Sequence, residues 1–174
     1  MSNDPELIER ARMIANHGSK KKYYNEIVGI NSRLDTIQAA ILRVKLRHLD
    51  RYTRARQAAA AKYDRLFSQY AHIECPAIAS DRDHVFHQYT VRVPQRDAMA
   101  AHLKAHHIPS AIYYPVPINR LPVFEGMPSA PLPETEKACS EVLSLPMHTE
   151  LTSEQQHHIA SVMAEFYQAS PVAP

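Results

Sequence analysis

Two polar side chains stand just ahead of a helical pattern in the stretch 29–42, GINSRLDTIQAAIL, and both can bind an anion. The guanidinium of Arg33 offers paired N–H donors that suit a diphosphate or a carboxylate, although an arginine at the start of a surface helix needs no ligand. The amide of Asn31 can donate a hydrogen bond without adding charge to a site. Its alternative role is to cap the helix that begins near Leu34, a position for which Ser32 competes. From the residues alone, both interpretations stay open.

Lysine is the side chain that forms Schiff bases, and a catalytic lysine must be kept neutral by burial or by neighbouring positive charge. Lys20, Lys21 and Lys22 crowd one another, but they lie in a polar loop where solvent screens the effect. The other lysines fall in helical patterns with ordinary surroundings. We therefore assign no catalytic residue to this chain.

The histidines and cysteines offer little for metal chemistry. His102 and His106 are one helical turn apart, a spacing that can hold zinc. Neither a third ligand nor a general-base glutamate accompanies them, so we expect a structural or surface role and no metal. Cys75 and Cys139 are far apart in the sequence, and we interpret them as two free thiols.

Composition narrows the classes of partner. The chain has 174 residues, 45% of them hydrophobic, with a formal net charge of +2, which gives no electrostatic reason to expect nucleic acid or an anionic membrane. The sequence holds no apolar run long enough to span a bilayer and no signal-peptide pattern, so we expect a cytoplasmic protein. The sequence has only 3 glycines but 13 prolines. Because phosphate-binding loops usually need glycine, few places remain for such a loop.

The elements that must position these residues follow from periodicity and capping. Asp4 and Pro5 predict a helix start, and Gly18 predicts its end near His17. A second helical pattern runs over 34–70 with a possible kink near Asp50. Beyond it we expect strands at 72–78, 84–94 and 108–117 and helices at 96–107, 134–145 and 151–168.

This order predicts an α+β fold, with long connecting helices and a small domain whose mainly antiparallel sheet is flanked by helices. We divide the chain into a large-domain remnant with an active-site loop (1–33), a connecting helix or helices (34–70), a small α+β domain (71–170) and a tail (171–174).

Four ordered strings carry a resemblance to a known family. The segments 3–50, 87–93 (HQYTVRV), 112–124 (IYYPVPINRLPVF) and 136–155 resemble the C-terminal portion of DegT/DnrJ-type nucleotide-sugar aminotransferases, which have the fold type I of aspartate aminotransferase. The resemblance implies pyridoxal 5′-phosphate (PLP) as the cofactor of the complete enzyme. The family's large domain, with its Schiff-base lysine, lies upstream of the point where this sequence starts, so we expect this chain alone to be inactive and to bind no cofactor by itself.

The resemblance also assigns roles. Asn31 would reach a neighbouring subunit's site and bind the cofactor phosphate there, and Arg33 would grip the sugar nucleotide. Tyr113, Tyr114 and Asn119 would contact the sugar. Tyr113 and Asn119 depart from the family's usual histidines, and a variant with asparagine at the second position fits members that aminate UDP-linked 3-keto N-acetylated sugars or their uronates.

We therefore expect the C-terminal segment of a transaminase that moves an amino group from glutamate to a keto-sugar nucleotide. The alternatives are a dehydratase of the same family that uses pyridoxamine phosphate, and a non-catalytic remnant or dimerisation module. In each case the apolar stripes on 7–14 and 34–44 would be exposed without the large domain, which predicts a homodimer or higher homo-oligomer.

Overall fold

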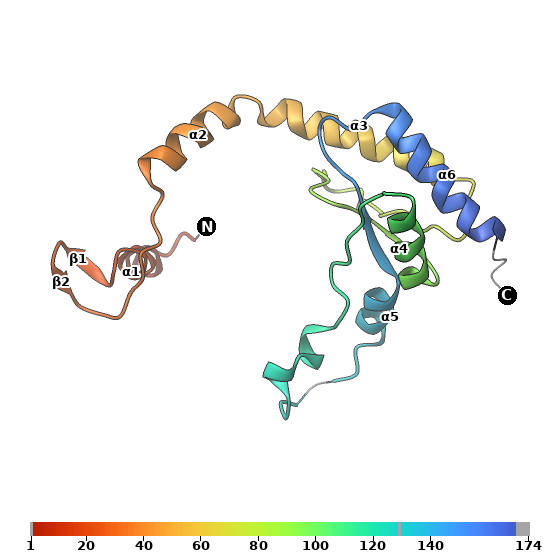
Figure 1. The fold of residues 1–174 in the computed structure, drawn as a ribbon. Coiled ribbons are helices and arrows are strands. Elements are labelled where there is room, and N and C mark those ends of the chain that lie inside the picture. The colour runs from red at the N-terminus through yellow and green to blue at the C-terminus, as the bar shows by residue number, and fades with distance from the viewer. Residues whose placement is uncertain (1, 129, 170–174) are drawn as a thin grey trace. The chain divides into compact units, whose positions relative to one another are not determined.

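A computed structural model describes residues 2–128 and 130–169, so the predicted tail at 171–174 lies outside the described residues. The chain divides into two compact units, Met1–Leu49 and Asp50–Pro174, and each is treated by itself (Figure 1). The division falls inside the connecting segment predicted from the sequence. The predicted domain boundaries at 33/34 and 70/71 stay a prediction.

The first unit begins with α1 (Pro5–Ala15), for which local capping supplies the start signal. The Asp4 carboxylate accepts hydrogen bonds from the amides of Glu6 and Leu7 at 2.9 and 3.2 Å, and Pro5 takes the first helical position. The helix ends at Ala15, two residues before the predicted end. A short hairpin of β1 (Ser19–Lys21) and β2 (Tyr24–Asn25) follows, and then α2 (Thr36–Leu46).

The first unit has no apolar core of its own. Among residues 2–49 only Gly18 and Ser19 are buried, and most of the large apolar side chains of both helices are exposed. In a packed segment such side chains are normally buried, because burial of each one stabilises the fold by about 1.5–3 kcal/mol. The exposed set on or beside α1 and α2 comprises Leu7, Ile14, Leu34, Ile37, Ile41, Leu42, Val44 and Leu46.

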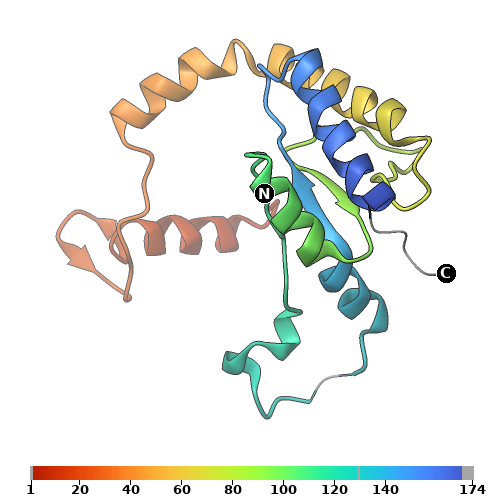
Figure 2. The same ribbon diagram turned by 45° about the vertical axis from the view of Figure 1, so that its right-hand side comes forward.

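The predicted 34–70 segment consists of two helices, α2 and α3 (Leu49–Phe67), with the break at 47–48, just before the predicted kink at Asp50. In the second unit, α3 and α6 (Ser153–Ala169) lie side by side, and the buried Gln156 donates from Nε2 to the carbonyl of Ala59 at 2.8 Å (Figure 2).

The sheet of the second unit is a two-stranded antiparallel pair, β3 (Tyr89–Arg92) with β4 (Val142–Leu145). Tyr89 pairs with Leu145 and Arg92 with Val142, so the two strands join segments that are about fifty residues apart in the sequence. The pair packs with α4 (Arg96–Ala105), which itself lies beside α6. The remaining elements are α5 (Pro133–Glu141), η1 (Ile118–Arg120) and η2 (Pro122–Phe124).

Several predicted elements are shorter or different. The helix predicted at 134–145 ends at Glu141, and 142–145 forms β4 instead, because pairing with β3 outweighs local helix propensity. The strands predicted at 72–78 and 108–117 each contribute one bridge, Glu74 to Arg92 and Ala111 to Ser144. Prolines within both segments remove amide donors that a longer ladder would need.

The core of the second unit is aromatic at its centre. The rings of Tyr63 and Tyr89 stack at 4.9 Å, and Tyr63 donates its hydroxyl to the carbonyl of Pro146 at 3.1 Å. Tyr89 donates to the Asp64 carboxylate at 2.6 Å, and burial raises the pKa of the Tyr89 phenol far above its usual value. Each buried hydroxyl is thus paired, as burial requires. Other fully buried members are Phe67, Val91, Met99, Leu103, Leu143 and Met163.

Truncating this core should unfold the second unit more easily. Leu103 is fully buried, so Leu103→Ala should lower the free energy of unfolding by about 2–5 kcal/mol, through lost contact and the cavity left behind. Leu121→Ala removes the same atoms from a side chain that is partly exposed in the same unit, and should cost less than about 1 kcal/mol. Urea unfolding followed by near-ultraviolet circular dichroism measures both. Equal losses would contradict the described core.

Candidate functional site

The backbone around Asn31 is pinned to the end of α1. The amide of Ile30 donates to the carbonyl of Ile14 at 2.8 Å, and the amide of Ser32 donates to the carbonyl of Ala15 at 2.9 Å. Ile30 in turn accepts from the amide of His17 at 2.9 Å. These three bonds place Asn31 opposite Asn16 and leave its side chain exposed. The side chain of Asn31 is therefore exposed on a backbone that is held in place.

The capping role considered for Asn31 is not found. The residue at the N-cap of α2 is Asp35, whose backbone amide donates to Oε1 of Gln38 at 3.1 Å. Asp35 is four positions after Asn31 and three positions after Ser32. Arg33 lies in the irregular segment between them and is exposed. Because α2 is capped without them, the side chains of Asn31 and Arg33 remain available for a ligand.

Two glycines make this arrangement possible. Gly18 has φ +77°, and a Cβ there would lie 1.7 Å from the carbonyl oxygen of Ile27. A Cβ on Gly29 would lie 2.0 Å from the amide nitrogen of Gly18. The two backbones therefore touch at the base of the 18–29 loop, and a side chain at either position would push them apart. Sequence reasoning assigned Gly18 only to the end of α1 and missed the contact.

Tyr113 lies in a pocket of about 370 Å³ in the second unit, next to the β3–β4 pair. Arg56 of α3 forms one wall, and its Nη1 donates to the carbonyls of Phe86, His87 and Met147, each at 3.1 Å. One guanidinium thus ties α3 to two separate chain segments. The sequence gives no local signal that distinguishes Arg56 from the other arginines of this helix.

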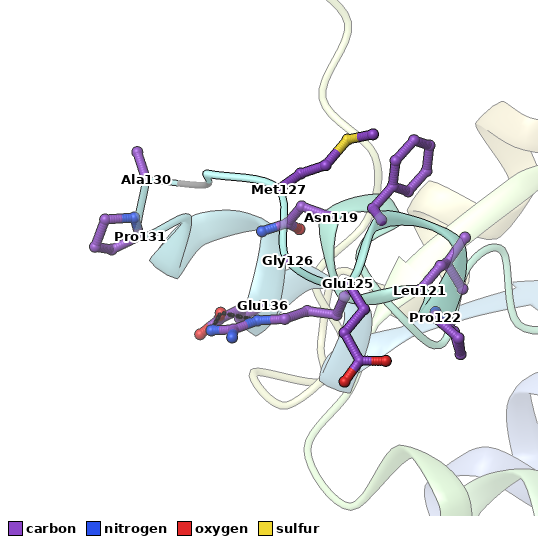
Figure 3. Close-up of a pocket in the computed structure, with 11 residues that line it drawn as sticks. Asn119, Leu121, Pro122, Glu125, Gly126, Met127, Ala130, Pro131 and Glu136 are labelled. Carbon is purple, nitrogen blue, oxygen red and sulfur yellow. Dashed lines mark hydrogen bonds and ion pairs between the residues drawn. The ribbon is translucent and has the colours of Figure 1, made fainter.

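Asn119 lies in a different pocket, of about 610 Å³, formed by η1, η2 and the start of α5 (Figure 3). Its wall includes Glu125 and the ion pair of Arg120 with Glu136 at 2.7 Å. Tyr114 is 71% exposed beside Tyr113. Of the three residues predicted to contact a sugar, Tyr113 and Asn119 therefore line separate pockets of the same unit.

The lysines do not suit a Schiff base. The carboxylate of Glu9 lies 2.8 Å from Nζ of Lys20 and raises the pKa of that lysine, the opposite of what an attacking amine needs. Lys62 is half-buried but donates to Oγ of Ser153, and the remaining lysines are exposed. Among residues 2–128 and 130–169, no lysine therefore has the buried setting that a Schiff base needs.

The paired histidines serve packing. Nε2 of His102 lies 3.0 Å from the carbonyl of Val162, which can only accept, so this nitrogen carries a proton. The His102 ring also packs against the rings of His106 and Phe166, with centroid distances of 4.6 and 5.4 Å. No group of three potential metal ligands occurs in the described part of the chain. Likewise, no described helix is long and apolar enough to cross a membrane.

Replacing Gly29 should open the loop that holds Asn31. Gly29→Ala places a methyl group against backbone that cannot move aside, at a cost of about 1–3 kcal/mol. The amides of His17, Ile30 and Ser32 should then exchange with deuterium roughly 10- to 100-fold faster. Gly126→Ala is the control: a Cβ there meets nothing within 4 Å, and the strain that alanine meets at its φ of +81° arises in the second unit, away from these amides. Unchanged protection in Gly29→Ala would contradict the described contact.

Residues 1–164 match the model of the DegT/DnrJ/EryC1/StrS aminotransferase family. The chain is 49% identical over 171 residues to a pleiotropic regulatory protein of Geobacillus stearothermophilus, covering 96% of this chain and 46% of that protein. It is 44% identical over 147 residues to a UDP-2-acetamido-2-deoxy-3-oxo-D-glucuronate aminotransferase of Pseudomonas aeruginosa, covering 84% and 40%.

The fold agrees. The solved structure of DesV from Streptomyces venezuelae, in complex with a ketimine intermediate, superposes with a TM-score of 0.87 at 40% identity, covering 99% of this chain and 47% of that one. The chain thus spans about half the length of the relatives it matches. The predicted α+β class and its relation to fold type I aminotransferases are confirmed. This chain belongs to the DegT/DnrJ/EryC1/StrS aminotransferase family and corresponds to the C-terminal part of its members.

Proposed function

We propose that this chain forms the C-terminal half of a PLP-dependent, cytoplasmic transaminase that moves an amino group from glutamate to a keto-sugar nucleotide. The observation that carries the proposal is the family match over 1–164 together with an exposed Asn31 amide on a pinned backbone that no helix cap uses. PLP, when bound, carries the amino group between donor and sugar. The names of relatives such as the Pseudomonas aeruginosa enzyme favour amino transfer over sugar dehydration.

Asn31 would donate its side-chain N–H to the cofactor phosphate in a neighbouring subunit's site. Because the amide is neutral, it adds a hydrogen bond to the phosphate without changing the net charge of the cofactor site. Arg33, two residues on, would grip an anionic group of the sugar nucleotide with its paired donors. Both side chains are exposed in the first unit, which is what a role in another subunit's site requires.

Tyr113, Tyr114 and Asn119 would form part of the wall around the sugar. Tyr113 and Tyr114 present hydroxyls and Asn119 an amide, all groups that hydrogen-bond sugar hydroxyls or an N-acetyl group. The sugar class we propose is a UDP-linked 3-keto sugar or its uronate. It is supported by Asn119 in place of the family's usual histidine and by the 44% identical relative that acts on such a uronate.

A second candidate is a non-catalytic module that associates with an intact family member. Two observations favour it: no described lysine suits a Schiff base, and a relative at 49% identity is named a regulatory protein. In that case the exposed faces of α1 and α2 would serve association alone.

Reconstitution tests the main proposal. The chain is co-expressed with the amino-terminal segment of the 44% identical Pseudomonas aeruginosa enzyme, ending where this chain's match begins. The assembled pair should transfer an amino group from glutamate to the UDP-linked 3-keto uronate, while each segment alone should not. Asn31→Ala should weaken PLP binding roughly 10- to 100-fold, since a hydrogen bond to a charged group contributes about 1.5–3 kcal/mol. Ser32→Ala, a change at the exposed neighbour, is the control.

Two results would contradict this proposal. One is equal PLP affinity in Asn31→Ala and Ser32→Ala. The other is a covalent PLP adduct on a lysine of this chain alone, detected by mass spectrometry after borohydride reduction.

We expect this chain to self-associate through the exposed apolar side chains of the first unit. The apolar side chains of α2 should hold the chain in a dimer or larger species, because large exposed apolar patches drive association. Ile37→Asp with Ile41→Asp should shift the mass measured by light scattering towards the monomer. Val123→Asp changes an equally exposed apolar residue in the second unit and should leave the mass unchanged. A monomeric wild-type chain at high concentration would contradict the prediction.

A further inference from the structure

A small pocket in the second unit gathers three histidines from three separate segments. It has a volume of about 220 Å³ and lies where the end of α4, the loop after β4 and the first half of α6 meet. The two helices lie side by side (Figure 1). The segments contribute His107, His148 and His158 in turn. None of the residues predicted to bind the cofactor phosphate or the sugar lines this pocket.

His107 occupies a backbone position that glycine usually takes. It follows α4 with φ +58°. Its amide donates to the carbonyl of Lys104 at 3.0 Å, and the amide of Ile108 donates to the carbonyl of Leu103 at 2.9 Å. These two bonds form the Schellman pattern, whose residue with positive φ is most often glycine. The imidazole is therefore held at the pocket despite an unfavourable backbone conformation, a combination that often marks functional positions.

Two other polar side chains of the pocket are oriented by local hydrogen bonds. Nδ1 of His148 accepts from the amide of Glu150 at 3.2 Å, so the neutral ring carries its proton on Nε2. Oε1 of Gln155 accepts from the amide of Thr152 at 2.9 Å, and Oγ1 of Thr152 accepts from the amide of Gln155 at 3.2 Å. This reciprocal cap leaves the side-chain NH₂ of Gln155 as a donor. Both side chains thus offer N–H groups to a ligand.

The pocket has a polar rim and an apolar interior. The three histidines and Gln155 are exposed, whereas Ile108 and Ile159, which also line the pocket, are buried. No carboxylate occurs among the described residues that line it. The charged residues nearest to it in the sequence, which do not line it, are Lys104, Glu150 and Glu154.

This lining favours a ligand with an anionic end and an apolar body. A carboxylate can only accept hydrogen bonds, so it matches a rim of N–H donors. An anion also favours the charged form of an imidazole that lies beside it. A cationic ligand would find no carboxylate to pair with among the lining residues.

The size of the pocket limits the ligand further. Its volume is that of roughly seven water molecules in the liquid, and it is smaller than the pockets that hold drug-sized ligands. The described residues include no group of three side chains that could hold a metal ion, so the three imidazoles do not converge on one point. A small organic molecule therefore fits these observations better than a metal.

We propose that this pocket binds a small organic carboxylate with an apolar body. The carboxylate accepts hydrogen bonds from Nε2 of His148 and from the side-chain NH₂ of Gln155, and the apolar body packs against Ile108 and Ile159. This binding site goes beyond the proposed function, and it needs neither PLP nor a sugar nucleotide.

Titration of the full-length chain with benzoate tests this inference. The histidine side-chain signals are followed by carbon-13 NMR, and those of His107, His148 and His158 should shift. Benzamide has the same shape without the charge, and acetate has the charge without the apolar body. Each should bind roughly tenfold more weakly than benzoate, because each lacks one of the two contacts.

A charge change at the rim gives the sharpest variant. Gln155→Glu keeps the reciprocal cap of α6 but places a carboxylate at the rim, and should weaken benzoate binding roughly tenfold or more through repulsion. His148→Ala with His158→Ala should weaken it to a similar degree. His72→Ala with His157→Ala is the matched control, since it removes two exposed histidines that do not line the pocket and should leave the affinity unchanged.

Four results would overturn the proposal. Equal affinity for benzoate and benzamide, or equal benzoate affinity in the wild type and Gln155→Glu, would exclude recognition of a carboxylate. No benzoate binding, or equal benzoate affinity in the two double histidine variants, would exclude the site. The reconstitution assay is independent of these outcomes, because it reports on Asn31 and amino transfer.

Discussion

The contact between Gly18 and Gly29 is the constraint on which the candidate site depends. It lets two stretches of backbone approach more closely than any side chain permits, and it closes the 18–29 loop at its base. The bonds from Ile30 and Ser32 to the end of α1 can form only on that closed loop. Backbone hydrogen bonds therefore hold the stretch that carries Asn31 and Arg33, in a unit whose described residues form no apolar core.

The second unit is built on the opposite principle. Its order comes from buried aromatic and aliphatic side chains, with the Tyr63 and Tyr89 hydroxyls paired inside the core and Arg56 holding three carbonyls at its edge. Such a unit can present Tyr113 and Asn119 on stable supports. The first unit, with exposed apolar helices, has the character of a surface meant to be covered by other protein.

Local signals predicted local structure well. Asp4 and Pro5 marked the start of α1, and Gly18 marked its end to within two residues. Non-local pairing was the source of error: residues 142–145 continue a helical pattern, but β3 pairs with them as a strand. At the site, spacing could not show whether Asn31 caps α2, because the deciding fact is the position of Asp35 relative to the helix start. The family resemblance supplied the assignment, and the free Asn31 side chain is compatible with it.

The central claim is that Asn31 serves a cofactor held by another subunit. A crystal structure of the chain assembled with the amino-terminal segment and PLP tests it most directly. The account predicts that Nδ2 of Asn31 lies within hydrogen-bonding distance of the phosphate in the neighbouring subunit's site. An Asn31 side chain that faces solvent in the assembled enzyme, or that contacts only its own subunit, would contradict it.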